Sequence, residues 1–197
     1  MIDTPHGPAR AHVHAADGEP RAALMLGHGA GGGIKARDLQ AVTAAAREVG
    51  LTVALVEQPY VVAGRRSAAP AHQLDTAWLA VVEHLRAGEL AGLPLVTGGR
   101  SAGARVACRT AAQSEAIAVL CLAFPVHPPG KPEKTRLDEL DGVDVPVLVI
   151  QGERDPFGMP PAGPGREVAV VPGTHSFTRG LDGVVEAARE WLASIKR

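Results

Sequence analysis

Short apolar runs alternate along this chain with longer stretches in which apolar residues recur at helical spacing. The runs occupy residues 22–26, 52–56, 94–97, 117–123, 145–150 and 168–171. Strands that are apolar on both faces are typical of a parallel sheet covered by helices on both sides. The sequence therefore predicts an α/β fold, a three-layer α/β/α sandwich around a mostly parallel, doubly wound sheet. In such sheets ligands bind at the carboxyl ends of the strands.

Helical spacing of apolar residues places helices over residues 39–49, 74–85, 102–112 and 184–195. A short helix is predicted over residues 133–140, and an additional strand over residues 11–15. The 197 residues contain no internal repeat and no linker, so we expect a single domain spanning residues 1–197.

Composition argues against several classes of protein. The formal net charge is −1, with acidic and basic residues interspersed, so a nucleic-acid partner is not expected. No apolar run approaches the roughly 18 residues of a membrane span, and residues 1–10 lack the apolar segment of a secretion signal. We therefore expect a cytoplasmic protein without a membrane partner, as a monomer or small homo-oligomer. Cys108 and Cys121 both lie in apolar stretches and are interpreted as buried hydrophobic residues.

A metal site is the weakest of the functional hypotheses. His12 and His14 would share one face of the additional strand, but no third ligand has suitable spacing. We predict no metal and no cofactor.

The segment Gly99–Gly103 has the pattern G-x-S-x-G and lies between a predicted strand and a predicted helix. A sharp strand-to-helix turn strains the backbone of Ser101, at a cost of about 1–3 kcal/mol. The two glycines allow strand and helix to approach closely. An ordinary glycine-rich turn is the alternative, but this context predicts that Ser101 is a nucleophile.

A nucleophilic serine needs a base, and the base needs an acid to orient it. Asp155 follows the fifth apolar run, and His175 follows the sixth. Taken singly, Asp155 before a proline suits a turn and His175 suits a surface. Their joint placement beyond strand ends, in the order Ser, Asp, His, predicts a catalytic triad.

The glycine-rich loop over residues 27–33 follows the first run, where an oxyanion hole is expected. We predict that the backbone amides of Ala30 and Ala102 bind the oxyanion. His28 is expected to hydrogen-bond this loop rather than act as the base.

The same loop offers a competing interpretation. Gly27, Gly29 and Gly32 match G-x-G-x-x-G, and Glu57 ends the next run, where a dinucleotide-binding fold binds ribose. The following helix starts at about residue 38, too late to direct its N-terminus at a pyrophosphate. This alternative would also leave Ser101, Asp155 and His175 without a role.

These motifs resemble the KANL3/Tex30-like family, related to dienelactone hydrolases within the α/β-hydrolase superfamily. The similarity rests on residues 28–31, 98–106, 124–133, 151–158 and 175–177. It implies a minimal α/β-hydrolase fold without a lid domain. Some members of the family act as scaffold subunits, so a catalytically silent protein-binding role is a second alternative.

The sequence thus predicts a serine hydrolase that cleaves an ester or thioester of a small, accessible acyl substrate. Besides the triad, we expect residues around the site to support it or to contact substrate at its rim. They are His28, Gly29, Arg100, His127 and Lys131.

Overall fold

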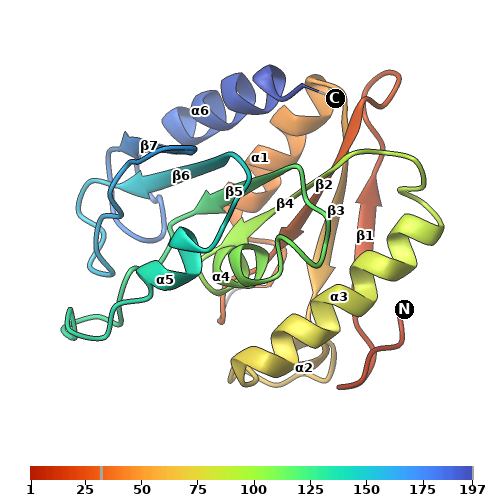
Figure 1. The fold of residues 1–197 in the computed structure, drawn as a ribbon, viewed down its shortest axis with the longest axis horizontal. Helices are drawn as coiled ribbons and strands as arrows, with labels where there is room; N and C mark the ends of the chain where they lie inside the picture. Colours follow the sequence, from red (N-terminus) through yellow and green to blue (C-terminus); the bar gives the residue numbers. More distant parts are fainter. Residues whose placement is uncertain (32, 197) are drawn as a thin grey trace.

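The computed structural model describes residues 1–31 and 33–196, and seven strands form one sheet (Figure 1). The strands are β1 (Arg10–His14), β2 (Ala22–Gly27), β3 (Leu51–Glu57), β4 (Leu95–Arg100), β5 (Ala118–Leu122), β6 (Val147–Gly152) and β7 (Arg166–Val171). The helices are α1 (Arg37–Glu48), α2 (Pro59–Val62), α3 (Ala71–Ala87), α4 (Ala102–Arg109), α5 (Leu137–Asp141) and α6 (Leu181–Ser194). The predicted α/β class and its three layers are confirmed.

The strand order is β1-β3-β2-β4-β5-β6-β7, and β1 is antiparallel to β3 whereas the other neighbours are parallel. Figure 1 shows α1 and α6 side by side on one face of the sheet, with α3 and α4 on the other. The chain adds β3 on one side of β2 and then β4 on the other. The loops after β2 and β4 therefore flank a topological switch point, which is where doubly wound sheets bind ligands.

The central strands are buried on both faces because successive side chains enter different layers of the core. In β2, Leu24 and Leu26 pack with α1 and α6, whereas Ala23 and Met25 pack with α3. Complete burial of a leucine or methionine side chain contributes about 1.5–3 kcal/mol. This two-sided burial keeps the strand ends at fixed positions.

Cys108 of α4 and Cys121 of β5 are buried, free thiols whose Sγ atoms lie 3.5 Å apart. They belong to the apolar cluster between α4 and the sheet. The prediction that they act as small hydrophobic residues is confirmed.

Two elements end three residues away from the sequence prediction. β4 continues past residue 97 to Arg100, because Gly98 and Gly99 fit where a side chain would collide with the neighbouring strands. α4 ends at Arg109 rather than at residue 112, and the Thr110 hydroxyl donates a hydrogen bond back to the Val106 carbonyl at its end.

The connection between β5 and β6 also differs in detail. Its helix α5 starts at Leu137 rather than at residue 133, because the Arg136 N–H donates to the Val126 carbonyl and holds the preceding loop out of helical register. Helix α2 was not predicted. Residues 123–146 contain only the five-residue helix α5, so no lid domain is inserted there.

Across residues 1–31 and 33–196, no helix combines the length and the apolar character that crossing a lipid bilayer requires.

Candidate active site

Ser101 occupies a sharp turn between β4 and α4, with φ 52° and ψ −108°. This left-handed backbone is costly for a residue with a side chain, by about 1–3 kcal/mol. A Cβ on Gly103 would lie 2.4 Å from the Gly27 carbonyl, and one on Gly99 would lie 2.6 Å from its oxygen. The turn therefore crosses the end of β2 so closely that only hydrogen atoms fit.

The structure brings together the three residues predicted as a triad. Ser101 Oγ lies 2.9 Å from His175 Nε2, and His175 Nδ1 lies 2.8 Å from Asp155 Oδ2. The Asp155 side chain is 0% exposed and the His175 side chain 15% exposed, so the hydrogen-bonded chain starts in the interior and ends at Ser101. The three residues follow β4, β7 and β6, at one edge of the sheet.

The Asp155 carboxylate is supported by a residue that was not predicted. Gln151 Nε2 donates to Asp155 Oδ2 at 2.9 Å, and the Phe157 N–H donates to Oδ1 at 2.8 Å. Gln151 is itself buried, and its Nε2 also lies 3.1 Å from the Phe124 carbonyl and 2.8 Å from the Gly158 carbonyl, so its two hydrogens are shared among three acceptors. A buried carboxylate requires such donors. A polar residue ending the apolar strand β6 is the sequence signal that could have identified Gln151.

Phe157 is a second residue of the site that was not predicted. Its ring stacks on the His175 imidazole, with ring centroids 4.1 Å apart and an interplanar angle of 30°. The contact restrains rotation of the imidazole about its side-chain bonds. No local motif marks Phe157, since its role depends on the loop after β7.

The loop after β2 is oriented by His28. The Gln58 N–H donates to His28 Nε2 at 3.1 Å, so the ring proton is on Nδ1, which donates to the Gly29 carbonyl at 2.8 Å. In a trans peptide the carbonyl and the following N–H point in opposite directions. His28 therefore turns the Ala30 N–H away from itself. Gly29 lies beside Ser101, since a Cβ built on it would be 3.6 Å from Ser101 Cβ.

Burial favours the neutral forms of His28 and Tyr60, the two residues that hydrogen-bond the loop after β2. It lowers the pKa of His28, an effect partly offset by the Gly29 hydrogen bond and by Glu57. Burial also raises the pKa of Tyr60 to about 12, and its protonated hydroxyl donates to the Ala30 carbonyl at 3.0 Å. Neutral forms of both residues thus fix the peptides on either side of Ala30.

The Ala102 amide is the first of α4. Amides in the first turn of a helix have no carbonyl four residues earlier to bind, and the helix dipole favours negative charge there. Ala30, Ser101 and Ala102 line one cavity.

Arg100 connects the Ser101 turn to two other loops. Its Nε donates to Asp38 Oδ2 at 2.7 Å, and its Nη2 donates to the His175 carbonyl at 3.2 Å. A Cβ on Gly29 would lie 2.9 Å from Arg100 Nη1, so Gly29 covers the guanidinium. Arg100 therefore holds the loops around Ser101 together, and it is not among the residues that line the cavity.

The cavity beside Ser101 has a volume of about 300 Å³. The side chains that line it are alanines and other apolar residues, with Ser101 and three arginines. They are Ala30, Ala68, Ala69, Ala71, Leu74, Ser101, Ala102, Arg105, Arg109, Pro125, Arg136 and Phe157.

Two residues predicted at the rim are placed elsewhere. His127 packs against Gly158, and its Nδ1 donates to the Pro128 carbonyl at 2.9 Å. Lys131 is exposed in the loop before α5. Neither lines the cavity, because the loop directs Pro125 and Arg136 toward Ser101 instead.

The features that suggested dinucleotide binding have other partners here. Glu57 accepts hydrogen bonds from Arg10 at 3.3 Å and from His12 at 2.9 Å, both on β1. Helix α1 starts only at Arg37. Gly32, the third glycine of the pattern, lies outside the described residues.

Known structures share this fold over nearly their whole length. A serine hydrolase without a lid from Xanthomonas campestris has 25% identity and a TM-score of 0.79, covering 99% of this chain and 94% of that one. Est1E from Butyrivibrio proteoclasticus, with ferulic acid bound, has 19% identity and a TM-score of 0.78, covering 97% and 96%. Dienelactone hydrolase from Anabaena variabilis has 17% identity and a TM-score of 0.78, covering 100% and 96%.

No curated protein matches the sequence. Residues 20–166 match the family described as alpha/beta hydrolase domain. This match covers most of the chain, including β2, the Ser101 turn and Asp155. The protein belongs to the α/β-hydrolase family.

Proposed function

We propose that this protein is a serine hydrolase that cleaves an ester or thioester of a small acyl substrate. The observation that supports this most strongly is the continuous hydrogen-bonded chain from Asp155 through His175 to Ser101. The proposal includes a single catalytic domain over residues 1–197. The loop over residues 124–133 also favours the KANL3/Tex30-like group within the family.

In the first half of the reaction, Ser101 Oγ attacks the carbonyl carbon while its proton passes to His175 Nε2. Asp155 accepts the Nδ1–H and stabilises the imidazolium that forms. The tetrahedral oxyanion is held by the Ala30 and Ala102 amides. Each such donor contributes about 2.7–4 kcal/mol to transition-state stabilisation.

His175 then gives its proton to the leaving alkoxide or thiolate, and the acyl group remains on Ser101. Water attacks this acyl-enzyme, with its proton again accepted by His175 Nε2. The bond between the acyl carbon and Ser101 Oγ then breaks, and Oγ takes back the proton from His175, which regenerates the enzyme. The products are a carboxylic acid and an alcohol or thiol.

A fluorophosphonate probe separates this proposal from a protein-binding role without catalysis. We expect wild-type protein to be labelled at Ser101 and to hydrolyse p-nitrophenyl hexanoate. Ser101→Ala abolishes labelling and reduces kcat by about a thousandfold or more. Ser194→Ala, on α6, is the matched control and retains both. Absence of labelling in wild type, or equal labelling of Ser101→Ala, would replace catalysis with the binding role.

A further inference from the structure

Three arginine side chains share the cavity with Ser101, and the proposed reaction gives them no role. Arg105 and Arg109 follow Ser101 by four and eight positions, so they lie on the same face of α4. Side chains of a helix tilt toward its N-terminus, which here is the end at Ser101. Arg136 approaches the cavity from the loop before α5.

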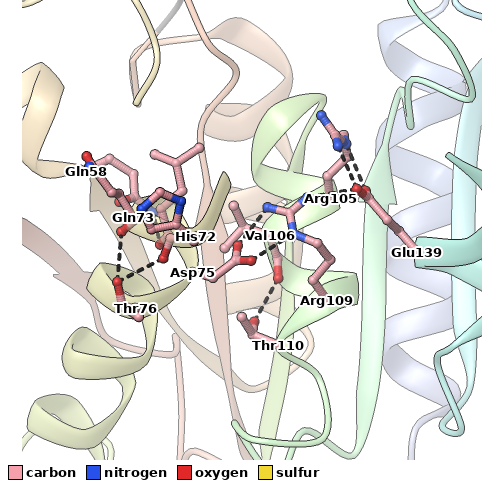
Figure 2. A network of polar contacts seen from close by, with 11 residues as sticks. Gln58, His72, Gln73, Asp75, Thr76, Arg105, Val106, Arg109, Thr110 and Glu139 are labelled. Atoms are coloured by element: carbon pink, nitrogen blue, oxygen red, sulfur yellow. Dashed lines mark hydrogen bonds and ion pairs between the residues drawn. The ribbon is translucent and has the colours of Figure 1, made fainter. Parts of the chain in front are cut away.

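Two of the three guanidinium groups are paired with carboxylates. Figure 2 shows Arg109 between Asp75 of α3 and Glu139 of α5, with Arg105 also bound to Glu139. Arg105 forms two bonds to Glu139, at 2.8 and 2.5 Å. Arg109 forms two to Asp75, at 2.8 and 2.6 Å, and a longer one of 3.1 Å to Glu139.

Arg136 differs from its two neighbours. Its Nη1 lies 3.5 Å from the Pro125 carbonyl, and within the described part of the chain no carboxylate forms an ion pair with it. Its pKa is lowered by burial and by the positive charges of Arg105 and Arg109, with Glu139 opposing them. Two carboxylates thus balance Arg105 and Arg109, and the charge of Arg136 leaves one positive charge in excess at the cavity.

The remaining wall of the cavity is largely apolar, with alanines, Leu74, Pro125 and Phe157. Such surroundings provide little polar screening, so they strengthen the attraction between the excess charge and an anion. A carboxylate matches the planar fork of a guanidinium and can accept two hydrogen bonds from it.

We infer that the cavity selects esters or thioesters that carry a carboxylate, which Arg136 binds while Ser101 attacks the carbonyl. This inference rests on the proposed function. It assigns the excess charge to substrate recognition and the apolar wall to the carbon chain between the two groups. Arg105 and Arg109 stay paired with Glu139 and Asp75, and their positive charges add to the electrostatic attraction of an anion to the cavity.

Two pairs of matched substrates test it. In p-nitrophenyl hexanoate and mono-p-nitrophenyl adipate the acyl chains differ only at the end, methyl in one and carboxylate in the other. The acetate esters of p-hydroxybenzamide and p-hydroxybenzoate differ in the leaving group, which carries a neutral carboxamide in one and a carboxylate in the other. We expect kcat/KM to be about tenfold higher for the anionic member of at least one pair, mainly through KM. Added NaCl lowers this preference by screening.

Variants of Arg136 assign the preference to its charge. Arg136→Gln should lower the ratio of anionic to neutral kcat/KM about tenfold, whereas Arg136→Lys should retain part of it. Arg189→Gln is the matched control and leaves the ratio unchanged, because Arg189 belongs to α6, on the opposite face of the sheet from α4. The ratio reports recognition separately from any general loss of activity.

The possible failures are distinguishable. If Ser101 is labelled and the neutral esters are cleaved, but neither pair shows a preference, the inference is overturned and the proposed function stands. A preference that survives Arg136→Gln unchanged also overturns it. If no ester is cleaved and Ser101 is not labelled, the proposed function fails and this inference fails with it.

Discussion

Arginines lie on both sides of Ser101 in the sequence, and they differ in charge balance. Arg100, directly before it, is paired with one carboxylate, that of Asp38, and also donates to the His175 carbonyl. Its side chain is 16% exposed and that of Asp38 only 3% exposed. Arg105 and Arg109, after it, are paired with Glu139 and Asp75, and they face the cavity together with Arg136, which has no ion pair within the described residues.

With the recognition that we infer for Arg136, one residue type positions one part of the site and binds a ligand in another. A balanced, buried pair has no remaining charge to offer, so it fixes geometry. A group with one cation in excess keeps a favourable interaction available for an anion. Charge balance and access to the cavity separate the two roles.

Breaking the balanced pair should have the largest effect. In Arg100→Met, Asp38 remains buried without its counterion, and we expect a loss of about 3–5 kcal/mol in the free energy of unfolding. Because the His175 loop loses a donor, kcat should fall by about a hundredfold on neutral and anionic esters alike. Denaturant titration and steady-state kinetics on both esters measure these effects.

For this variant the ratio of anionic to neutral kcat/KM is the deciding quantity. Arg189→Met serves as the control for loss of an arginine on α6. A changed ratio in Arg100→Met would mean that Arg100 also reaches the substrate, and the contrast between the two sites would be wrong.

Glu139→Gln tests the excess positive charge at the cavity. It removes one of the two carboxylates while keeping an amide of similar shape, so the excess positive charge at the cavity increases. We expect the ratio of anionic to neutral kcat/KM to rise about fivefold, corresponding to about 1 kcal/mol. Glu186→Gln, which affects a pair with Arg189 on α6, is the control. An unchanged ratio would indicate that Glu139 serves only to hold α4 against α5.

The last prediction concerns stability rather than recognition, and it involves His28, which binds the loop containing Ala30 and whose pKa is lowered by burial. Above the ordinary pKa of about 6.5 the imidazole is neutral in both folded and unfolded chains. Below it the unfolded chain binds a proton that the folded protein does not, so stability falls as the pH decreases. This contribution has a slope of at most about 1.4 kcal/mol per pH unit.

Unfolding titrations at several pH values between about 7.5 and 5.5 measure this slope. His28→Gln should show a shallower decline than wild type, and His72→Gln, at an exposed position of α3, should not. Equal slopes in all three proteins would show that His28 is not held neutral by its surroundings.

The sheet and the three residues of the proposed triad were predictable because their signals are local. A central strand is a short apolar run. Ser101 directly follows β4, and Asp155 and His175 lie three and four residues beyond β6 and β7. The β4 extension was missed because its glycines resemble a loop until the neighbouring strands are known.

The remaining features depend on contacts between distant segments. Glu139 and Asp75 are each 34 residues from the arginines they pair with most closely, so no local pattern predicts the charge balance. Phe157 reaches His175 only when the loops after β6 and β7 meet. The loop containing His127 and Lys131 was expected to present them at the rim, but its path presents Arg136 instead.

The crossing of the Ser101 turn over Gly27 also bears on how this protein can evolve. Every single-base change that replaces a glycine gives either a stop or a residue with a Cβ, and Gly99 and Gly103 have no room for one. Around the cavity, exchanges at arginine or alanine positions leave that crossing intact. Variation along the cavity wall can therefore accumulate, while no single replacement of Gly99 or Gly103 fits the Ser101 turn.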